Sequence, residues 1–196
     1  MRKYFNVEDS VCEVCCGTGH YSSLLSYQVS NVTGIDFADV LIEKARQRKS
    51  LANFIVGDAR EMPFEDNQFD GVISFSALYY IKEINEAFRE IHRIIKSNGV
   101  AIIELGNLYS INTLLTKGKE MQSYHISTRE MSELIKSNNF GVLEHRRFQV
   151  IMSKYFQNDM YRLLSKKIRK KMIDEHISTA LSPLAFRHLF VLRKWD

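Results

Sequence analysis

Short apolar runs rich in β-branched residues alternate with helical patterns along this chain, and this alternation constrains the fold more than any other feature. The runs that read as strands are residues 11–16, 31–36, 53–58, 69–75 and 100–105. Because these runs are apolar on both faces, we expect helices to cover both sides of their sheet, as in parallel strands joined by crossover connections. The alternation therefore predicts an α/β fold with a doubly wound sheet.

The rest of the pattern completes the predicted architecture. Helices are expected at residues 21–28, 39–49, 83–96 and 128–138, and Ser97-Asn98-Gly99 is expected to end the third in a left-handed cap. Further strands are expected at residues 142–152 and 185–194, the last one antiparallel, with a basic helical insert at 153–182 between them. We therefore predict a Rossmann-like, seven-stranded mixed sheet in a single domain that spans residues 1–196.

Composition is that of an ordinary globular protein. The chain has 196 residues, of which 45% are hydrophobic and 26% charged. No apolar run approaches the roughly 20 residues of a membrane span, and Met1-Arg2-Lys3-Tyr4 lacks the apolar stretch of a secretory signal. The three cysteines, Cys12, Cys15 and Cys16, predict reduced thiols and a cytoplasmic location, because an odd number accompanies no export signal. A zinc site is disfavoured, because no second cluster of ligands follows.

The C-terminal quarter of the chain is basic. Residues 145–196 hold 12 Lys and Arg against 4 Asp and Glu, and the densest run extends from Lys166 to Lys171 within an amphipathic helical pattern. The preferred interpretation is a helix whose apolar face closes a binding site. The alternatives are contact with an anionic membrane surface or with nucleic acid, and nucleic acid ranks last because no aromatic RNA-binding signature accompanies the run.

Acidic residues end three successive predicted strands. Ligands of open parallel sheets bind beyond the carboxyl ends of the strands, which is where Glu13, Asp36 and Asp58 are expected. A carboxylate such as Asp36, 17 residues after Gly19, suits a ribose diol, and Asp58 with the backbone N–H of Ala59 suits the edge of an adenine. Each acid alone is also compatible with a turn or a helix cap. Together they predict a pocket for a base, a ribose and a positively charged group.

Two glycines mark the first strand-to-helix turn. Gly17-Thr-Gly19 lets a ligand approach the backbone closely, and with Ser22 it nearly fits a dinucleotide fingerprint. The carboxylate of Glu13 beside this turn would repel a pyrophosphate and favours a cationic ligand instead. Phe37, next to Asp36, is expected either to pack on a base or to belong to the core.

Four ordered signatures carry a resemblance to a known family. They are Val11-Cys-Glu-Val-Cys-Cys-Gly-Thr-Gly19, Thr33-Gly-Ile-Asp36, Gly57-Asp-Ala59 with Met62-Pro-Phe64, and Phe69-Asp-Gly-Val-Ile-Ser74. From residue 11 to residue 105 the chain resembles the class I S-adenosylmethionine-dependent methyltransferases, in the broad group that includes the quinone-biosynthesis C-methyltransferases. The resemblance implies methyl transfer from S-adenosylmethionine to a small-molecule acceptor, with S-adenosylhomocysteine as the product.

The resemblance also implies a role for individual residues. Glu13, Gly17 and Gly19 would contact the methionine moiety, and Asp36 would contact the ribose. Asp58 and Ala59 would contact the adenine, and the backbone near Ser74 and Phe75 would contact the amino group. Cys15 stands where the family usually has glycine, so it is strained if that position needs a positive φ and narrows the pocket if it does not. Only residues 1–10 precede the first strand, so cover for the cofactor is expected from residues 107–127, residues 153–182 or a second subunit of a homodimer.

Methyl transfer from a sulfonium is an in-line displacement with a neutral leaving group, so positioning supplies much of the rate. The candidates for a general base are His20, Tyr79, Tyr80 and His125, although a structural role is favoured for each. By the resemblance, Tyr79 is the preferred substrate contact. Two other interpretations stay open: a non-catalytic partner subunit that binds the cofactor, and an NAD-type oxidoreductase, which Glu13 and Asp58 disfavour.

Overall fold

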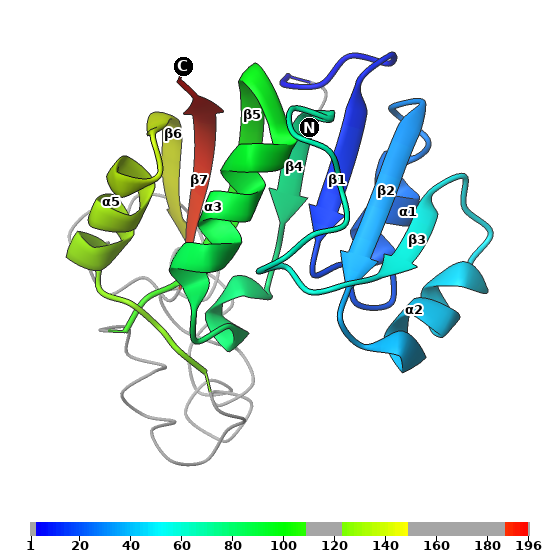
Figure 1. Cartoon of the computed structure of the whole chain (residues 1–196), viewed down its shortest axis with the longest axis horizontal. Coiled ribbons are helices and arrows are strands. Elements are labelled where there is room, and N and C mark those ends of the chain that lie inside the picture. Colours follow the sequence, from blue (N-terminus) through cyan, green and yellow to red (C-terminus); the bar gives the residue numbers. More distant parts are fainter. Residues whose placement is uncertain (1–2, 109–122, 149–186, 196) are drawn as a thin grey trace, which may run out of the picture.

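The computed structural model describes residues 3–108, 123–148 and 187–195 (Figure 1). The basic insert predicted at residues 153–182, including the run from Lys166 to Lys171, lies outside the described residues. So does most of the segment 107–127, which was expected to help cover the cofactor.

One sheet of seven strands organises the described residues, in the order β3-β2-β1-β4-β5-β7-β6 (Figure 1). Strands β1 to β5 are parallel, whereas β7 runs antiparallel to both β5 and β6. The prediction of a Rossmann-like mixed sheet with an antiparallel last strand is therefore confirmed. The strands are β1 (Ser10–Val14), β2 (Asn31–Asp36), β3 (Asn53–Val56), β4 (Phe69–Ser74), β5 (Ile95–Gly106), β6 (Phe140–Phe148) and β7 (Arg187–Lys194).

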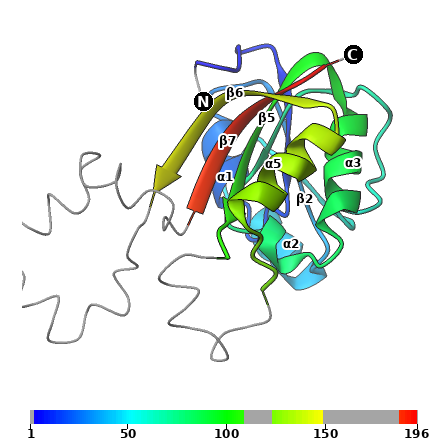
Figure 2. The same ribbon diagram turned by 90° about the vertical axis from the view of Figure 1, so that its left-hand side faces the viewer.

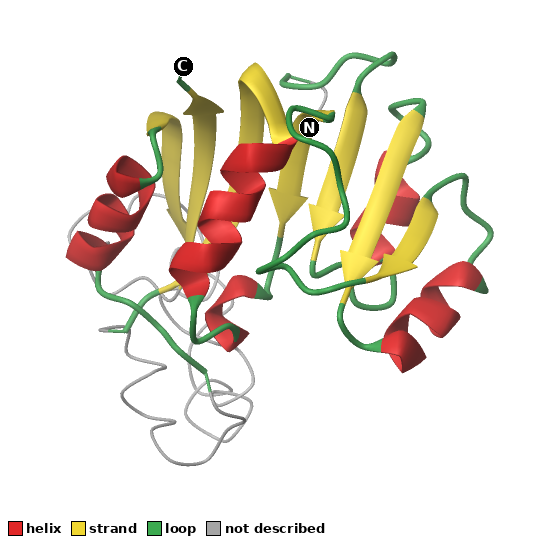
Figure 3. Ribbon diagram, in the orientation of Figure 1, coloured by secondary structure: helices red, strands yellow, loops and turns green. Residues whose placement is uncertain are grey.

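Helices cover both faces of the sheet (Figures 2 and 3). Leu25 of α1 packs with Val11 and Val32 on one face, whereas Phe88 of α3 and Met131 of α5 pack with the core of the opposite face. This arrangement explains why strands β1, β4 and β5 are apolar on both sides. The helices are α1 (His20–Leu25), α2 (Asp39–Arg46), the short 3₁₀ helix η1 (Leu78–Tyr80), α3 (Ile84–Ile94) and α5 (Thr128–Ser137).

Several predicted boundaries were wrong, and strand pairing gives the reason for the largest error. Helix α3 ends at Ile94, before the predicted Ser97-Asn98-Gly99 cap, because Ile95 already pairs with Phe69 of β4. Asn98 does adopt a left-handed conformation, with φ 63°, but it lies within β5. Helix α1 is shorter than predicted and ends at Leu25, whereas β6 begins earlier, at Phe140.

The order of the strands sets the position of a binding crevice. Strand β1 pairs with β2 on one side and with β4 on the other, so the connections that leave β1 and β4 diverge at their carboxyl ends. Ligands of open α/β sheets bind at such a reversal.

Within the described residues, no helix is long and apolar enough to cross a bilayer.

Candidate functional site

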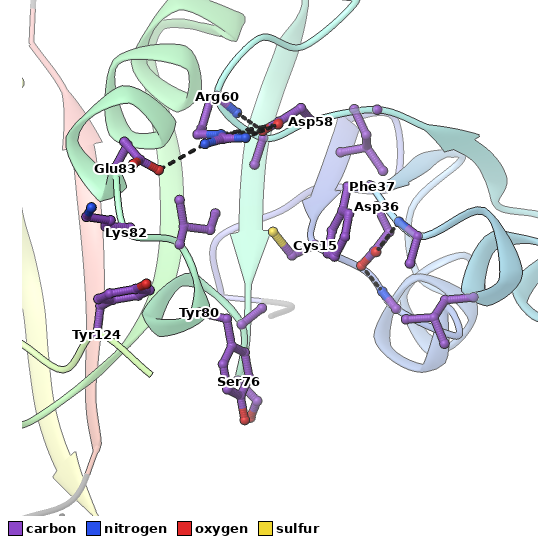
Figure 4. A pocket seen from close by; sticks show the side chains of 18 residues that line it. Cys15, Asp36, Phe37, Asp58, Arg60, Ser76, Tyr80, Lys82, Glu83 and Tyr124 are labelled. Carbon is purple, nitrogen blue, oxygen red and sulfur yellow. Dashed lines mark hydrogen bonds and ion pairs between the residues drawn. The ribbon is translucent and has the colours of Figure 1, made fainter. Parts of the chain in front are cut away.

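A cavity of about 780 Å³ opens at the carboxyl ends of the parallel strands (Figure 4). Its first wall, which follows β1, β2 and β3, comprises Cys15, Gly17, Ile35, Asp36, Phe37, Ala38, Leu41, Gly57, Asp58, Ala59 and Arg60. Its second wall comprises Ser76, Ala77, Tyr80, Ile81, Lys82, Glu83 and Tyr124. The names first wall and second wall refer to these two sets below.

The turn after β1 has three residues in the left-handed region within five positions. The φ angles are 59° at Cys15, 54° at Gly17 and 71° at Gly19. A Cβ on Gly17 would meet nothing within 4 Å, so its backbone is open to a ligand in the cavity, whereas a Cβ on Gly19 would lie 2.5 Å from the ring of Phe54. Gly17 therefore leaves space for a ligand, whereas Gly19 allows tight packing against Phe54.

Cys15 occupies the left-handed conformation that the sequence analysis named as a condition for strain. Glycine adopts this conformation freely, whereas a residue with a Cβ does so at a cost. The Cys15 sulfur lies beside the cavity (Figure 4). Burial, followed by the nearby charges of Asp36 and Asp58, raises the pKa of the Cys15 thiol to about 12, so the thiol is neutral near pH 7.

Asp36 joins the turn after β1 to the turn after β2. Its Oδ2 accepts a hydrogen bond of 2.7 Å from the Gly17 N–H, and its Oδ1 accepts one of 3.0 Å from the Ala38 N–H (Figure 4). The carboxylate is buried yet lines the cavity. Each carboxylate oxygen can accept more than one hydrogen bond, so this geometry leaves acceptor capacity for a pair of hydroxyls.

Glu13 has a different position from the one implied by the resemblance. Its side chain is 2% exposed, lies outside the cavity lining and accepts hydrogen bonds from the backbone N–H and the hydroxyl of Ser22 in α1. Burial raises the pKa of Glu13 to about 7, against the opposing effect of the Ser22 hydrogen bonds. Glu13 therefore holds α1 against β1 and supports the glycine turn from outside the cavity.

Asp58 is paired with a cation that the sequence analysis missed. Arg60 donates to the Asp58 carboxylate through Nε and Nη2, at 3.0 and 2.6 Å, and its Nη1 lies 2.9 Å from Glu83 Oε2 (Figure 4). The hydrogen bonds from Arg60 lower the pKa of Asp58. The spacing Asp-x-Arg gave a local signal for the first pair, but no local pattern links Arg60 to Glu83, 23 residues further along the chain.

The other predicted contacts divide between the cavity and the core. Ala59 and Phe37 line the cavity, and Phe37 is 78% exposed, so its alternative assignment to the core is wrong. Ser74 is buried and donates a hydrogen bond to the carbonyl of Val14, while the ring of Phe75 packs on Tyr21. Neither Ser74 nor Phe75 lines the cavity.

The candidate bases also lie in different places. His20 is an exposed residue at the start of α1, outside the cavity lining. Tyr79, the preferred substrate contact, is buried and stacks on His125 at 5.2 Å between ring centroids, and burial raises the pKa of Tyr79 to about 12. Its neighbour Tyr80, another of the candidates, lines the cavity in its place, and so does Tyr124, which was not among the residues predicted from the sequence.

Comparison with known proteins covers both walls of the cavity except Tyr124. A family model described as a methyltransferase domain matches residues 12–103. The demethylmenaquinone methyltransferase of Staphylococcus aureus (strain MRSA252) is 38% identical over 96 residues, which is 46% of this chain and 40% of that protein. The matched part therefore spans well under half of that relative.

Solved structures match a larger part of the chain but show the fold alone, because their sequence identity is low. An S-adenosylmethionine-dependent methyltransferase from Mesorhizobium loti aligns with a TM-score of 0.71 at 14% identity, covering 98% of this chain and 94% of that one. Haemonchus contortus phosphoethanolamine N-methyltransferase 2, solved with S-adenosyl-L-methionine, aligns with a TM-score of 0.71 at 17% identity, covering 98% of this chain and 50% of that one.

Proposed function

Residues 12–103 form a methyltransferase domain of the class I, S-adenosylmethionine-dependent type, and from this premise we propose that the chain transfers a methyl group from S-adenosylmethionine to a small-molecule acceptor. The bound cofactor supplies a methyl group on a positively charged sulfur, with a neutral leaving group. The chain's residues therefore need to bind, orient and exclude water rather than to generate a strong nucleophile.

The observation that carries this proposal is the geometry of Asp36. Its carboxylate ties the Gly17 and Ala38 amides together and still faces the cavity with unused acceptor capacity, which fits the paired hydroxyls of a ribose. The open space over Gly17 fits the amino-acid part of the cofactor, which needs close approach to the backbone. Glu13 supports this site indirectly, through the hydrogen bonds that hold α1.

Adenine is assigned to the neighbouring end of the first wall. Asp58 and the Ala59 N–H suit the exocyclic amine and a ring nitrogen, and the exposed ring of Phe37 offers an apolar face to the base. Arg60 already binds Asp58, so the amine would share the carboxylate with a guanidinium. We expect the contribution of Asp58 to binding to be smaller than that of Asp36 for this reason.

For the acceptor, we propose an apolar molecule that carries a ring. Tyr80 and Tyr124 line the second wall together with Ala77 and Ile81, and aromatic side chains favour offset or edge contacts with other rings. A curated relative that acts on demethylmenaquinone supports the same class of acceptor.

Other expectations stay proposals. They are a homodimer that covers the cofactor, an anionic membrane contact through the run from Lys166 to Lys171, a single domain over residues 1–196 and a cytoplasmic location. Co-sedimentation with anionic vesicles at low and high salt tests the membrane contact, because electrostatic binding weakens as salt rises. Nucleic acid as a partner, a non-catalytic partner subunit and an NAD-type oxidoreductase gain no support from the comparisons.

Calorimetry with S-adenosylmethionine and S-adenosylhomocysteine tests the proposed cofactor site. We expect Asp36→Ala and Asp58→Ala to weaken binding by ~1–3 kcal/mol each, with the larger loss at Asp36, because hydrogen-bonding groups are left unpaired. Asp39→Ala is the matched control, since it removes an exposed carboxylate close to the site that does not line the cavity. If both variants bind with the affinity of the wild type, the assignment of Asp36 and Asp58 to the cofactor site is wrong. If the wild type itself binds neither compound, the proposed cofactor is wrong.

A further inference from the structure

Lys82 differs from the other charged residues that line the cavity, because its charge has no partner. The charged lining residues are Asp36, Asp58, Arg60, Lys82 and Glu83. The Asp36 carboxylate accepts hydrogen bonds from two backbone amides, and the Arg60 guanidinium joins the carboxylates of Asp58 and Glu83. Within the part of the chain that the structure describes, the Lys82 side chain makes no hydrogen bond or ion pair. One ammonium group of the lining is therefore available to a ligand.

Lys82 belongs to the second wall, on the short segment between η1 and α3. Its backbone follows the end of η1, where the Ile81 N–H donates to the Leu78 carbonyl at 3.1 Å. Figure 4 shows Lys82 on this wall between Glu83 and Tyr124. Lys82 is exposed, and a lysine carries its ammonium at the tip of a flexible stem with three rotatable donors. The charge is therefore within reach of a molecule that lies against the second wall.

The acid that follows Lys82 in the sequence does not neutralise it. The Glu83 carboxylate is directed to Arg60, with 2.9 Å between its Oε2 and Arg60 Nη1. An ammonium without a counter-charge attracts anionic groups, and hydrogen bonds between ionised partners are stronger than neutral ones. A bound ring would also displace water from this wall, which strengthens the attraction further. The second wall thus offers a cation, whereas the first wall offers the carboxylates of Asp36 and Asp58.

Most of the candidate bases are absent from the cavity lining. Of His20, Tyr79, Tyr80 and His125, only Tyr80 lines the cavity. An acceptor that binds as an oxyanion has already released its O–H proton to solvent, so it needs no base for that proton. A nearby ammonium favours this ionised form. An unpartnered lysine on the acceptor side of the cavity therefore fits an acceptor that carries a negative charge.

We propose that Lys82 binds the methyl acceptor through an oxyanion carried on its ring, which is either a phenolate or a ring carboxylate. This inference rests on the proposed function and deepens it, since it adds an acidic group to the apolar ring. Quinone-type acceptors stay within the class. A ring carbonyl accepts a hydrogen bond from the same ammonium, and the reduced, hydroquinone form carries O–H groups that can ionise.

The test measures binding of nitro-aromatic probes to the protein saturated with S-adenosylhomocysteine. The first probe, para-nitrophenol, ionises close to neutral pH and changes colour as it does so, whereas its methyl ether, para-nitroanisole, cannot ionise. We expect the wild type to bind the phenolate about tenfold more tightly than the neutral phenol, which lowers the ionisation midpoint of the bound probe by about one pH unit. The ether should bind no more tightly than the neutral phenol.

A third probe distinguishes the two sources of the oxyanion. It is para-nitrobenzoate, which keeps the ring and the nitro group and carries a carboxylate in place of the phenolate. Tighter binding of the benzoate than of the phenolate assigns the Lys82 contact to a ring carboxylate, and the reverse order assigns it to a phenolate. Either result supports the proposal, provided that the preference for the oxyanion depends on Lys82.

Variants at Lys82 show whether the preference depends on this residue. Lys82→Met removes the charge and keeps an unbranched side chain, so the preference for the oxyanion should fall below about threefold. Lys82→Arg keeps the charge and should keep about half of the preference or more on a logarithmic scale. Lys136→Met is the matched control for net charge, because it removes an exposed lysine of α5 that does not line the cavity. It should behave as the wild type.

Failure of the inference and failure of the proposed function give different results. If the wild type does not bind S-adenosylhomocysteine, the proposed function is wrong. If it binds S-adenosylhomocysteine but none of the probes, or binds phenol and phenolate equally, the cofactor site stands and the role of Lys82 is overturned. The role is also overturned if Lys82→Met retains the preference, or if Lys136→Met loses as much of it as Lys82→Met does.

Discussion

The two walls of the cavity are held in place by different kinds of interaction. The first wall is built from backbone geometry: left-handed φ angles at Cys15 and Gly17, and a carboxylate at Asp36 that accepts hydrogen bonds from two amides. The second wall is held by side chains from distant strands, with Arg187 and Glu104 fixing Ser76. The family match, residues 12–103, contains the whole first wall and all of the second wall except Tyr124, but it ends before Glu104 and Arg187, the ion pair that holds Ser76.

The two kinds of support differ in how clearly they can be recognised in a sequence. A wall made by short backbone motifs constrains residue types over a few adjacent positions, so it keeps a recognisable pattern. The support of Ser76 in the second wall comes instead from Arg187 and Glu104, which are 83 positions apart in sequence, so no local pattern records it. Under the proposed function, the first wall would serve the cofactor and the second wall would serve the acceptor.

The largest predicted effect tests whether backbone geometry holds the first wall. Gly19→Ala should cost roughly 4 kcal/mol of unfolding free energy, because its φ is 71° and the added Cβ would lie 2.5 Å from the Phe54 ring. Gly17→Ala is the matched control: its φ is similar, but its Cβ would meet open space, so about 1 kcal/mol is expected. Urea unfolding measures both. Equal losses would mean that packing against Phe54 is unimportant.

The next prediction compares the two buried glutamates, one behind each wall. Glu104 pairs with Arg187, so Glu104→Gln leaves a largely buried guanidinium without its counter-charge and should cost about 3 kcal/mol. Glu13 has hydrogen-bond donors from Ser22 but no cation among the contacts of the described residues. Glu13→Gln keeps the shape and an acceptor oxygen, so it should cost far less at pH 8. A larger loss of unfolding free energy for Glu13→Gln than for Glu104→Gln would contradict this prediction.

The pH dependence of stability provides a second test of Glu13. The pKa of Glu13 is about 7 in the folded protein against 4.5 as the ordinary value, so its stabilising effect is complete below pH 4.5 and is lost as the pH rises through 7. Relative to Glu13→Gln, the wild type should therefore lose up to about 3 kcal/mol between pH 4.5 and pH 8. Melting curves of both proteins across this range provide the measurement.

A second buried group acts in the opposite direction and serves as a control. Burial, with smaller effects of His145 and Arg147, lowers the pKa of His188 to about 4, so its stabilising effect is present above pH 6.5 and is lost as the pH falls through 4. The two groups partly cancel between pH 4.5 and pH 6.5 in the wild type. Glu13→Gln should therefore show stability that rises with pH in that range, and a flat profile of this variant would contradict the effect assigned to His188.

The same distinction explains how much the sequence could predict. The alternation of strands and helices, the glycine turn and the acids at Asp36 and Asp58 follow from local patterns, and the structure brings Asp36 and Asp58 to one cavity. The position of Glu13 could not be predicted, because the direction of its side chain depends on where α1 packs. The link from Arg60 to Glu83 and the network around Ser76 depend on tertiary contacts between segments with no shared pattern.

Tyr79 and Tyr80 illustrate the limit at a single position. Adjacent residues in an irregular segment point in different directions, and the turn of η1 decides which one faces the cavity. That turn buries Tyr79 against His125 and leaves Tyr80 45% exposed in the second wall. Neither hydrophobicity nor residue type distinguishes two neighbouring tyrosines, so the sequence could not show that Tyr80 lines the cavity and Tyr79, the preferred substrate contact, does not.

A smaller effect is expected at Cys15, where the first wall departs from the usual glycine. Cys15→Val should cost about 2 kcal/mol, because a β-branched residue tolerates a φ of 59° least. Cys15→Gly should gain at most about 1 kcal/mol, since relief of the strained φ is partly offset by the greater flexibility of glycine in the unfolded chain. Chemical unfolding of both variants provides the measurement. A stabilised valine variant would show that φ is not left-handed at this position.

The smallest expected effect concerns the contact between the two walls. Arg60, which follows the first wall's Asp58, reaches Glu83 of the second wall at 2.9 Å, but both side chains are 42% exposed. Exposed ion pairs contribute little to stability, so Glu83→Gln should leave the unfolding midpoint within experimental error of the wild type. Glu133→Gln, which breaks the exposed pair with Arg129 on α5, is the control and should behave alike. If Glu83→Gln alone lowers the midpoint, and more so at low salt, then Arg60 couples the two walls, and the cofactor and acceptor ends of the cavity are not independent.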